Sequence, residues 1–150
     1  MKILIVGAGP SGLMFASQMK KKKPDWKIDV VEKNNSDDVF GWGVVLPGKA
    51  KQHPANPLSY IDLPEALSPQ YLDEFKLSKN DQSNHISTGI TLCGVERKGL
   101  VKSLRSLCQS LGIDIKYNFP ITNDIERYKR DYDLVVVSKG INHKVDFYSP

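Results

Sequence analysis

Three glycines and one glutamate are the residues of this 150-residue chain whose spacing most clearly indicates chemistry. The glycines stand as Gly7-x-Gly9-x-x-Gly12 directly after an apolar run, and Glu32 follows 20 residues after Gly12. In this spacing the first glycine permits a sharp turn, the second lets backbone approach a pyrophosphate, and the third lets a helix pack closely on a strand. An acid at the later position binds ribose hydroxyls. The pattern therefore predicts a dinucleotide site; the alternative is a tight turn with a surface glutamate.

The elements around these residues predict how they are positioned. A strand over Ile3–Val6, a helix from Pro10 to about Lys22 and a strand over Ile28–Val31 form a right-handed βαβ unit with parallel strands. Proline suits the first turn of a helix because its missing N–H would be unpaired there. A pyrophosphate would lie at the N-terminus of this helix, where free N–H groups and the helix dipole favour negative charge. We expect a Rossmann-like α/β domain.

The middle of the chain is less regular. Residues 34–67 show no period of 2 or 3.6, and such a long irregular loop inside a domain is usually functional. Gly41 and Gly43 flank Trp42, so this loop could admit a flat ring system, or Trp42 could pack into the domain's own core; both remain open. A short helix is predicted from Ser68, and one or two strands over Ile86–Leu92.

The last third returns to regular patterns. A helix is expected from about Lys98 to Leu111 with a buried stripe, and strands over Ile113–Tyr117 and Tyr132–Val137. The stripe consists of Leu100, Leu104, Leu107 and Leu111, with Val101 and Cys108 beside it. The carboxyl end of the last strand, Ser138–Gly140, should open on the same crevice as the glycine loop. Arg97 begins the helix and could reach a phosphate, or be an exposed arginine.

Composition excludes several functions. The chain is 40% hydrophobic and 25% charged, which fits one ordinary globular domain. Its net charge of +4 comes partly from Lys20–Lys23, which falls at a helix end without interleaved aromatics, so neither a nucleic-acid nor a membrane surface is expected. The two cysteines have no metal spacing and suggest a reducing, cytoplasmic setting. We expect no metal site and no catalytic side chain, which leaves the chemistry to a cofactor.

Several segments of the sequence resemble a known enzyme family. Gly7–Gly12 with Glu32 and Lys33 resembles the FAD-binding start of the flavin-dependent (class A) aromatic hydroxylases. Further segments resemble the violacein-pathway branch of that family. These segments are Gly41–Gly48, Gln52–Tyr60, Ser87–Gly89, Leu92–Leu100, Asp133–Val136, Gly140 and Asn142–Lys144. The resemblance covers essentially the whole chain.

The resemblance implies a cofactor, a reaction and a set of binding residues. FAD would be bound, NADPH would reduce it, and dioxygen would supply the oxygen inserted into an indole substrate. The cofactor-binding residues would be Gly7, Ala8, Gly9, Pro10, Ser11, Gly12, Glu32, Lys33, Gly41, Val44, Arg97 and Gly140. Arg97 would touch the flavin cofactor, and the loop around Gly41 and Val44 would lie near its ring.

Two departures from the family pattern bear on this expectation. The family commonly has Ala-Asp-Gly where this chain has Ser138, Lys139 and Gly140, and the family's later Gly-Asp motif is absent. We therefore interpret residues 1–150 as the N-terminal part of an FAD/NAD(P)-binding domain. Residues 34–95 would contribute a loop and first strands toward a substrate domain that this sequence lacks. The alternatives are an NAD(P)-dependent Rossmann oxidoreductase and a non-catalytic FAD-binding module.

Overall fold

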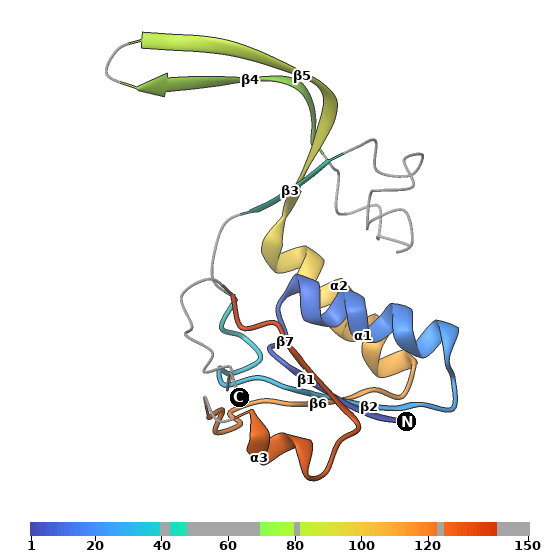
Figure 1. Cartoon of the computed structure of the whole chain (residues 1–150). Helices are drawn as coiled ribbons and strands as arrows, with labels where there is room; N and C mark the ends of the chain where they lie inside the picture. The colour runs from blue at the N-terminus through green and yellow to red at the C-terminus, as the bar shows by residue number, and fades with distance from the viewer. Residues whose placement is uncertain (40–42, 48–69, 80–81, 123–124, 141–150) are drawn as a thin grey trace. The chain divides into compact units, whose positions relative to one another are not determined.

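The computed structural model describes residues 1–39, 43–47, 70–79, 82–122 and 125–140. Its elements are β1 (Lys2–Val6), α1 (Pro10–Lys22), β2 (Lys27–Val31), β3 (Gly43–Pro47), β4 (Gln70–Lys79), β5 (Gln82–Glu96), α2 (Arg97–Ser110), β6 (Asp114–Lys116), α3 (Glu126–Lys129) and β7 (Leu134–Val137) (Figure 1). The chain divides into two compact units, of which one combines Met1–Val39 with Val101–Pro150 and the other is Phe40–Leu100.

The first unit is built on a four-stranded parallel sheet in the order β6-β2-β1-β7. Side chains alternate between the two faces of a strand, so Leu4 and Val6 face one side and Ile3 and Ile5 the other. All four are buried, as a strand covered on both faces requires. The expected Rossmann-like α/β fold with its parallel sheet is confirmed.

Helices cover both faces of this sheet. The helices α1 and α2 lie together on one face, where the Cys108 thiol of α2 is 3.4 Å from the Leu13 carbonyl oxygen of α1 (Figure 1). On the other face α3 supplies Tyr128, which packs in a cluster with Leu4 and Val6. This four-residue helix was not predicted, because one turn is too short to show a helical period.

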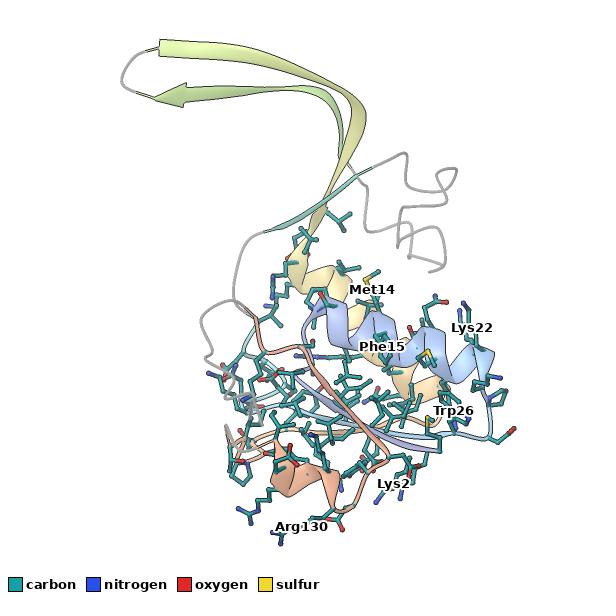
Figure 2. The ribbon with its side chains drawn as sticks, viewed as in Figure 1. Lys2, Met14, Phe15, Lys22, Trp26 and Arg130 are labelled. Carbon is teal, nitrogen blue, oxygen red and sulfur yellow. The ribbon has the colours of Figure 1, made fainter. Side chains whose placement is uncertain are left out.

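The lysine run ends α1 as expected. Lys20, Lys21 and Lys22 occupy the last turn, where cations complement the helix dipole. The Lys20 ammonium donates to the carbonyl oxygens of Pro24 at 2.7 Å and Trp26 at 2.8 Å, which fixes the turn into β2. Figure 2 shows Lys22 at the end of α1 and Trp26 in the following turn.

The buried stripe of α2 differs from the predicted one. Leu100, Val101, Leu104 and Cys108 are buried, whereas Leu107 and Leu111 are partly exposed. The prediction that Cys108 is a core residue agrees with this burial, which raises the pKa of its thiol to about 12. The stripe therefore follows the 3.6-residue period of Leu100, Leu104 and Cys108, and the leucine spacing alone placed it too far along the helix.

The second unit contains an antiparallel sheet in the order β3-β5-β4. The helix predicted from Ser68 is wrong, because Gln70–Lys79 form β4 and pair with β5. Across these strands Leu72 pairs with Leu92 and Phe75 with Ile86, and such long-range pairing overrides a local helix signal. The predicted irregular segment also contains β3, in which Val44 pairs with Val95.

Within the described ranges, no helix is long and apolar enough to cross a membrane.

Candidate functional site

The carboxyl ends of the four parallel strands bring the predicted residues Gly7 and Glu32 to one edge of the sheet. Gly7 and Glu32 directly follow β1 and β2, and Tyr117 and Ser138 directly follow β6 and β7. Backbone hydrogen bonds continue the sheet through this edge, from the N–H of Gly7 to Val31 O, of Ser138 to Val6 O and of Glu32 to Lys116 O, each at 2.8 Å. The crevice at this edge is where open α/β sheets bind ligands.

The glycine loop is packed too tightly for any side chain at two positions. Gly7 has φ +114°, and a Cβ there would lie 2.5 Å from the Ser138 carbonyl oxygen. A Cβ on Gly12 would lie 2.2 Å from the Gly7 carbonyl oxygen and 2.7 Å from the Ser138 hydroxyl. The first and third glycines of the motif are therefore required by close backbone contact. Ser138, whose hydroxyl donates to Gly7 O at 3.4 Å, is the residue against which both pack.

The N-terminus of α1 has hydrogen-bond donors that the helix itself does not use. Gly9 is its N-cap with extended backbone, and no side chain of the described residues caps it. The first intrahelical bond runs from Leu13 N to Gly9 O at 3.1 Å, so the N–H groups of Ser11 and Gly12 have no partner within the helix. Pro10 has no N–H to lose. This end of α1 fits an anionic group such as a pyrophosphate.

Glu32 lies beside this donor set and links two loops. One of its carboxylate oxygens, Oε2, accepts from the Ala8 N–H at 2.8 Å, and the other, Oε1, accepts from the Asn34 N–H at 3.0 Å. A carboxylate has about four lone-pair sites, so these two bonds leave room for two hydroxyl donors. The side chain is only partly buried. The arrangement fits a ribose diol, and it shows that Glu32 also fixes the glycine loop.

The remaining predicted residues are divided between the units. Lys33 is exposed beside Glu32, and Gly140 follows β7 with φ +85°. Val44 in β3 and Arg97 at the start of α2 belong to the second unit. The Arg97 Nε is buried and lacks a hydrogen-bond partner within the described ranges. Gly41 and Trp42 lie outside the described residues, so both interpretations of their loop stay predictions.

Lys139 stands at the position where the family pattern has an aspartate. The Lys139 ammonium donates to the Thr122 carbonyl oxygen at 3.2 Å. The cation on this strand end therefore donates to the polypeptide itself.

The sequence interpretation missed two residues at this edge. Arg105 of α2 donates to the Ser36 carbonyl oxygen, and its guanidinium carbon lies 5.1 Å from the centre of the Tyr117 ring. Neither residue stands in a motif, and only the position of Tyr117 directly after β6 could have indicated it.

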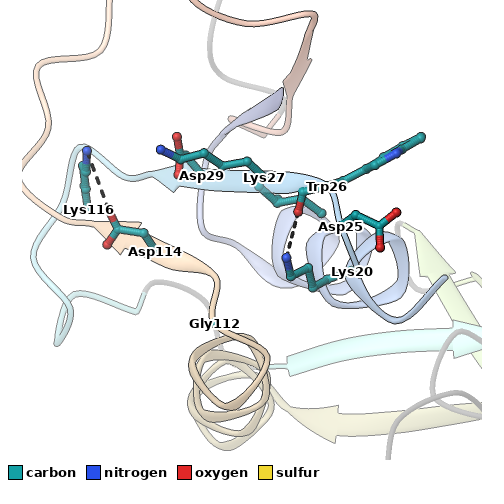
Figure 3. A pocket seen from close by; sticks show the side chains of 9 residues that line it. Lys20, Asp25, Trp26, Lys27, Asp29, Gly112, Asp114 and Lys116 are labelled. Atoms are coloured by element: carbon teal, nitrogen blue, oxygen red, sulfur yellow. Dashed lines mark hydrogen bonds and ion pairs between the residues drawn. The ribbon is translucent and has the colours of Figure 1, made fainter. Parts of the chain in front are cut away.

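The opposite edge of the sheet has a hollow of about 360 Å³, shown in Figure 3. It lies at the amino ends of β2 and β6 and is lined by Lys20, Asp25, Trp26, Lys27, Ile28, Asp29, Gly112, Asp114 and Lys116. Three lysines and three aspartates are among these residues, and Lys116 pairs with Asp114 at 3.7 Å. No residue of Gly7–Gly12 lines the hollow, so it is separate from the glycine loop. The structure, where described, groups no three residues that could hold a metal ion.

Comparison with curated proteins finds close relatives of which the chain spans only a part. It is 55% identical over 149 residues to a protodeoxyviolaceinate monooxygenase of Chromobacterium violaceum, and the match covers 99% of this chain and 40% of that protein. It is 31% identical over 148 residues to a salicyloyl-CoA 5-hydroxylase of a Streptomyces species, covering 96% of this chain and 27% of that protein. No protein-family model matches the chain.

Solved structures share the fold. The 2-methyl-3-hydroxypyridine-5-carboxylic acid oxygenase superposes with a TM-score of 0.59 at 20% identity, over 78% of this chain and 31% of the other. A flavoprotein/dehydrogenase from Cytophaga hutchinsonii superposes with a TM-score of 0.58 at 22% identity, over 81% and 31%. The resemblance of this chain to the flavin-dependent aromatic hydroxylases is thus confirmed, over a part of their length.

Proposed function

We propose that this chain is the FAD-binding part of an FAD- and NADPH-dependent monooxygenase that hydroxylates the 5-position of the indole ring of protodeoxyviolaceinate in violacein biosynthesis. The observation that carries the proposal is the 55% identity, over 99% of the chain, to the protein named protodeoxyviolaceinate monooxygenase. The reaction consumes O2 and NADPH and acts on a small molecule. The free, buried thiol of Cys108 is in keeping with a reducing, cytoplasmic location.

The geometry of the first unit supports dinucleotide binding. The N–H groups of Ser11 and Gly12, which have no partner within α1, suit the pyrophosphate, and Glu32 suits the ribose. FAD, when bound, supplies the redox chemistry that no side chain here provides. The chain's own part is to hold the cofactor at the carboxyl edge of the sheet.

We propose that Arg97, Val44 and Gly41 of the second unit also bind the cofactor. A buried guanidinium nitrogen without a partner costs free energy that a phosphate or flavin acceptor would recover. Arg97 is therefore suited to an anionic or carbonyl acceptor. We propose that Val44 and Gly41 lie near the flavin ring, and that polypeptide beyond residue 150 completes the site and binds the indole.

The proposal is tested by comparing the 150-residue chain with the longer protein obtained by continuing its reading frame. Each is reconstituted with FAD and supplied with NADPH, O2 and protodeoxyviolaceinate, and the product is measured by mass spectrometry. We expect one added oxygen with the longer protein and no turnover with the 150-residue chain. Turnover by the short chain would contradict the proposal that it is a fragment. A longer protein that binds FAD but does not oxygenate protodeoxyviolaceinate would contradict the proposed substrate.

Two other candidate functions can be distinguished from this proposal by experiment. Glu32 would bind the ribose of NAD as well as that of FAD, so the first unit also fits a nicotinamide-dependent oxidoreductase. A colourless protein that takes up NAD(H) and cannot be reconstituted with FAD would favour it. A protein that binds FAD but has no activity would be a non-catalytic FAD-binding module.

The activity assay also needs a control substrate. One relative is named a salicyloyl-CoA 5-hydroxylase, so a salicyl thioester serves as that control.

A further inference from the structure

The loops that follow β2 and β6 continue side by side beyond the sheet. The Phe119 N–H donates to Glu32 O at 2.9 Å, and the Asn118 N–H donates to Asn34 O at 3.2 Å. Asn118 adopts a left-handed conformation with φ 51°, which asparagine tolerates better than most residues. The two loops therefore form one hydrogen-bonded layer at the end of the sheet where Glu32 lies.

Arg105 connects this layer to α2. One terminal nitrogen of its guanidinium donates to the Ser36 carbonyl oxygen in the loop after β2. The guanidinium carbon lies 5.1 Å from the centre of the Tyr117 ring, which begins the loop after β6. A planar guanidinium can donate and stack at the same time, whereas an ammonium has no plane with which to stack. One side chain thus holds both loops.

The contact with Ser36 leads directly to Glu32. Ser36 lies in the turn that Asp38 N closes on Asn35 O at 3.2 Å, and Asn34 immediately before it donates its N–H to Glu32 Oε1 at 3.0 Å. Arg105 anchors this turn, the turn places Asn34, and Asn34 orients the carboxylate. No contact between Arg105 and the carboxylate is needed for this effect.

We propose that Arg105 is a positioning residue for the adenosine end of the dinucleotide, acting through Ser36 and Asn34 on Glu32. The proposal rests on the proposed function, since Glu32 needs this orientation only if it binds a ribose. Arg105 would favour the carboxylate geometry that leaves two acceptor sites open toward the crevice.

The electrostatics at Tyr117 agree with this arrangement. Burial raises the pKa of the Tyr117 phenol from its ordinary value of 10.0; the Arg105 charge lowers it, and the Glu32 charge raises it. Both charges therefore act on one ring, and Tyr117 stays neutral at physiological pH. A neutral ring is a surface on which the guanidinium can stack without forming an ion pair.

The test is a double-mutant cycle on ADP binding, measured by calorimetry in the full chain. Arg105→Met should weaken ADP binding about tenfold, which corresponds to about 1.4 kcal/mol. In the Glu32→Gln background the same substitution should have no further effect, because Arg105 acts through Glu32. Arg130→Met, which removes an exposed arginine of the same unit, is the matched control and should bind ADP as the parent does.

The outcomes separate this inference from the proposed function. An equal loss of affinity in both backgrounds, or no loss in either, overturns the role of Arg105 while ADP binding by the parent stands. A parent that binds neither ADP nor FAD overturns the proposed function instead. If Arg105→Met does not fold, Arg105→Lys decides: a smaller loss that disappears with Glu32→Gln supports the inference, and unchanged ADP affinity contradicts it.

Discussion

The Glu32 carboxylate accepts a hydrogen bond of 2.8 Å from the backbone N–H of Ala8 inside the glycine loop. The residue expected to bind ribose is thus also part of the support for the pyrophosphate loop. One side chain couples the two halves of the dinucleotide site, so its loss should affect folding and binding together.

Replacement of Glu32 by glutamine tests this coupling. Glutamine keeps one acceptor oxygen and has an NH2 donor in place of the other. Both backbone N–H groups then lose a charged acceptor, and one of them loses its acceptor altogether, at a cost of about 1 kcal/mol of unfolding free energy. FAD affinity should fall about tenfold. Urea unfolding and FAD titration measure the two effects. Glu126→Gln, at an exposed pair with Lys129, is the matched control, and an equal effect there would contradict the coupling.

Replacement of Gly12 by alanine tests the tight packing of the loop. Its Cβ would approach Gly7 O to 2.2 Å, so the loop must move, at a cost of about 1–3 kcal/mol. We expect a lower melting temperature and loss of FAD binding. Ser11→Ala, one residue away and exposed, should stay within about 0.5 kcal/mol of the parent. A Gly12→Ala protein as stable as the parent would show that the loop is looser than described.

Much of the first unit could be predicted because its signals are local. The strand around Ile5, the glycine turn and the helix from Pro10 are each encoded by neighbouring residues, and a parallel sheet follows from their order. The strand β4 could not be predicted in this way, since Tyr71 and Leu72 form a strand only through pairing with β5. Arg105 was missed for the same reason, because its partner Ser36 lies 69 residues away.

The thiol of Cys108 predicts a dependence of stability on pH. Burial raises its pKa from 9.0 to about 12, so the folded protein keeps a proton that the unfolded chain releases. The stabilisation is therefore complete below pH 9.0 and is lost as the pH rises toward about 12, at about 1.4 kcal/mol per pH unit. Urea unfolding at several pH values should show a shallower decline for Cys108→Ala than for the parent. Identical slopes would contradict a buried, neutral thiol.

The hydrogen bond from the Tyr132 hydroxyl to Asp29 Oδ2, at 2.9 Å, predicts a loss of stability in Tyr132→Phe. Asp29 is only 6% exposed, so removal of its donor should cost about 1.5–3 kcal/mol. Adding Asp29→Leu should recover part of this loss, because the buried carboxylate that lost its donor is then absent. Thermal unfolding measures both variants. A Tyr132→Phe protein with the parent's melting temperature would show that Asp29 is solvated in solution.

FAD titration of the protein, followed by flavin absorbance and fluorescence, tests the central claim most directly. We expect saturable FAD binding that ADP competes away and that Glu32→Gln weakens, with Glu126→Gln unchanged. A protein that leaves the absorbance and fluorescence of added FAD unchanged, and instead binds NAD(H) at the same glycine loop, would contradict the account.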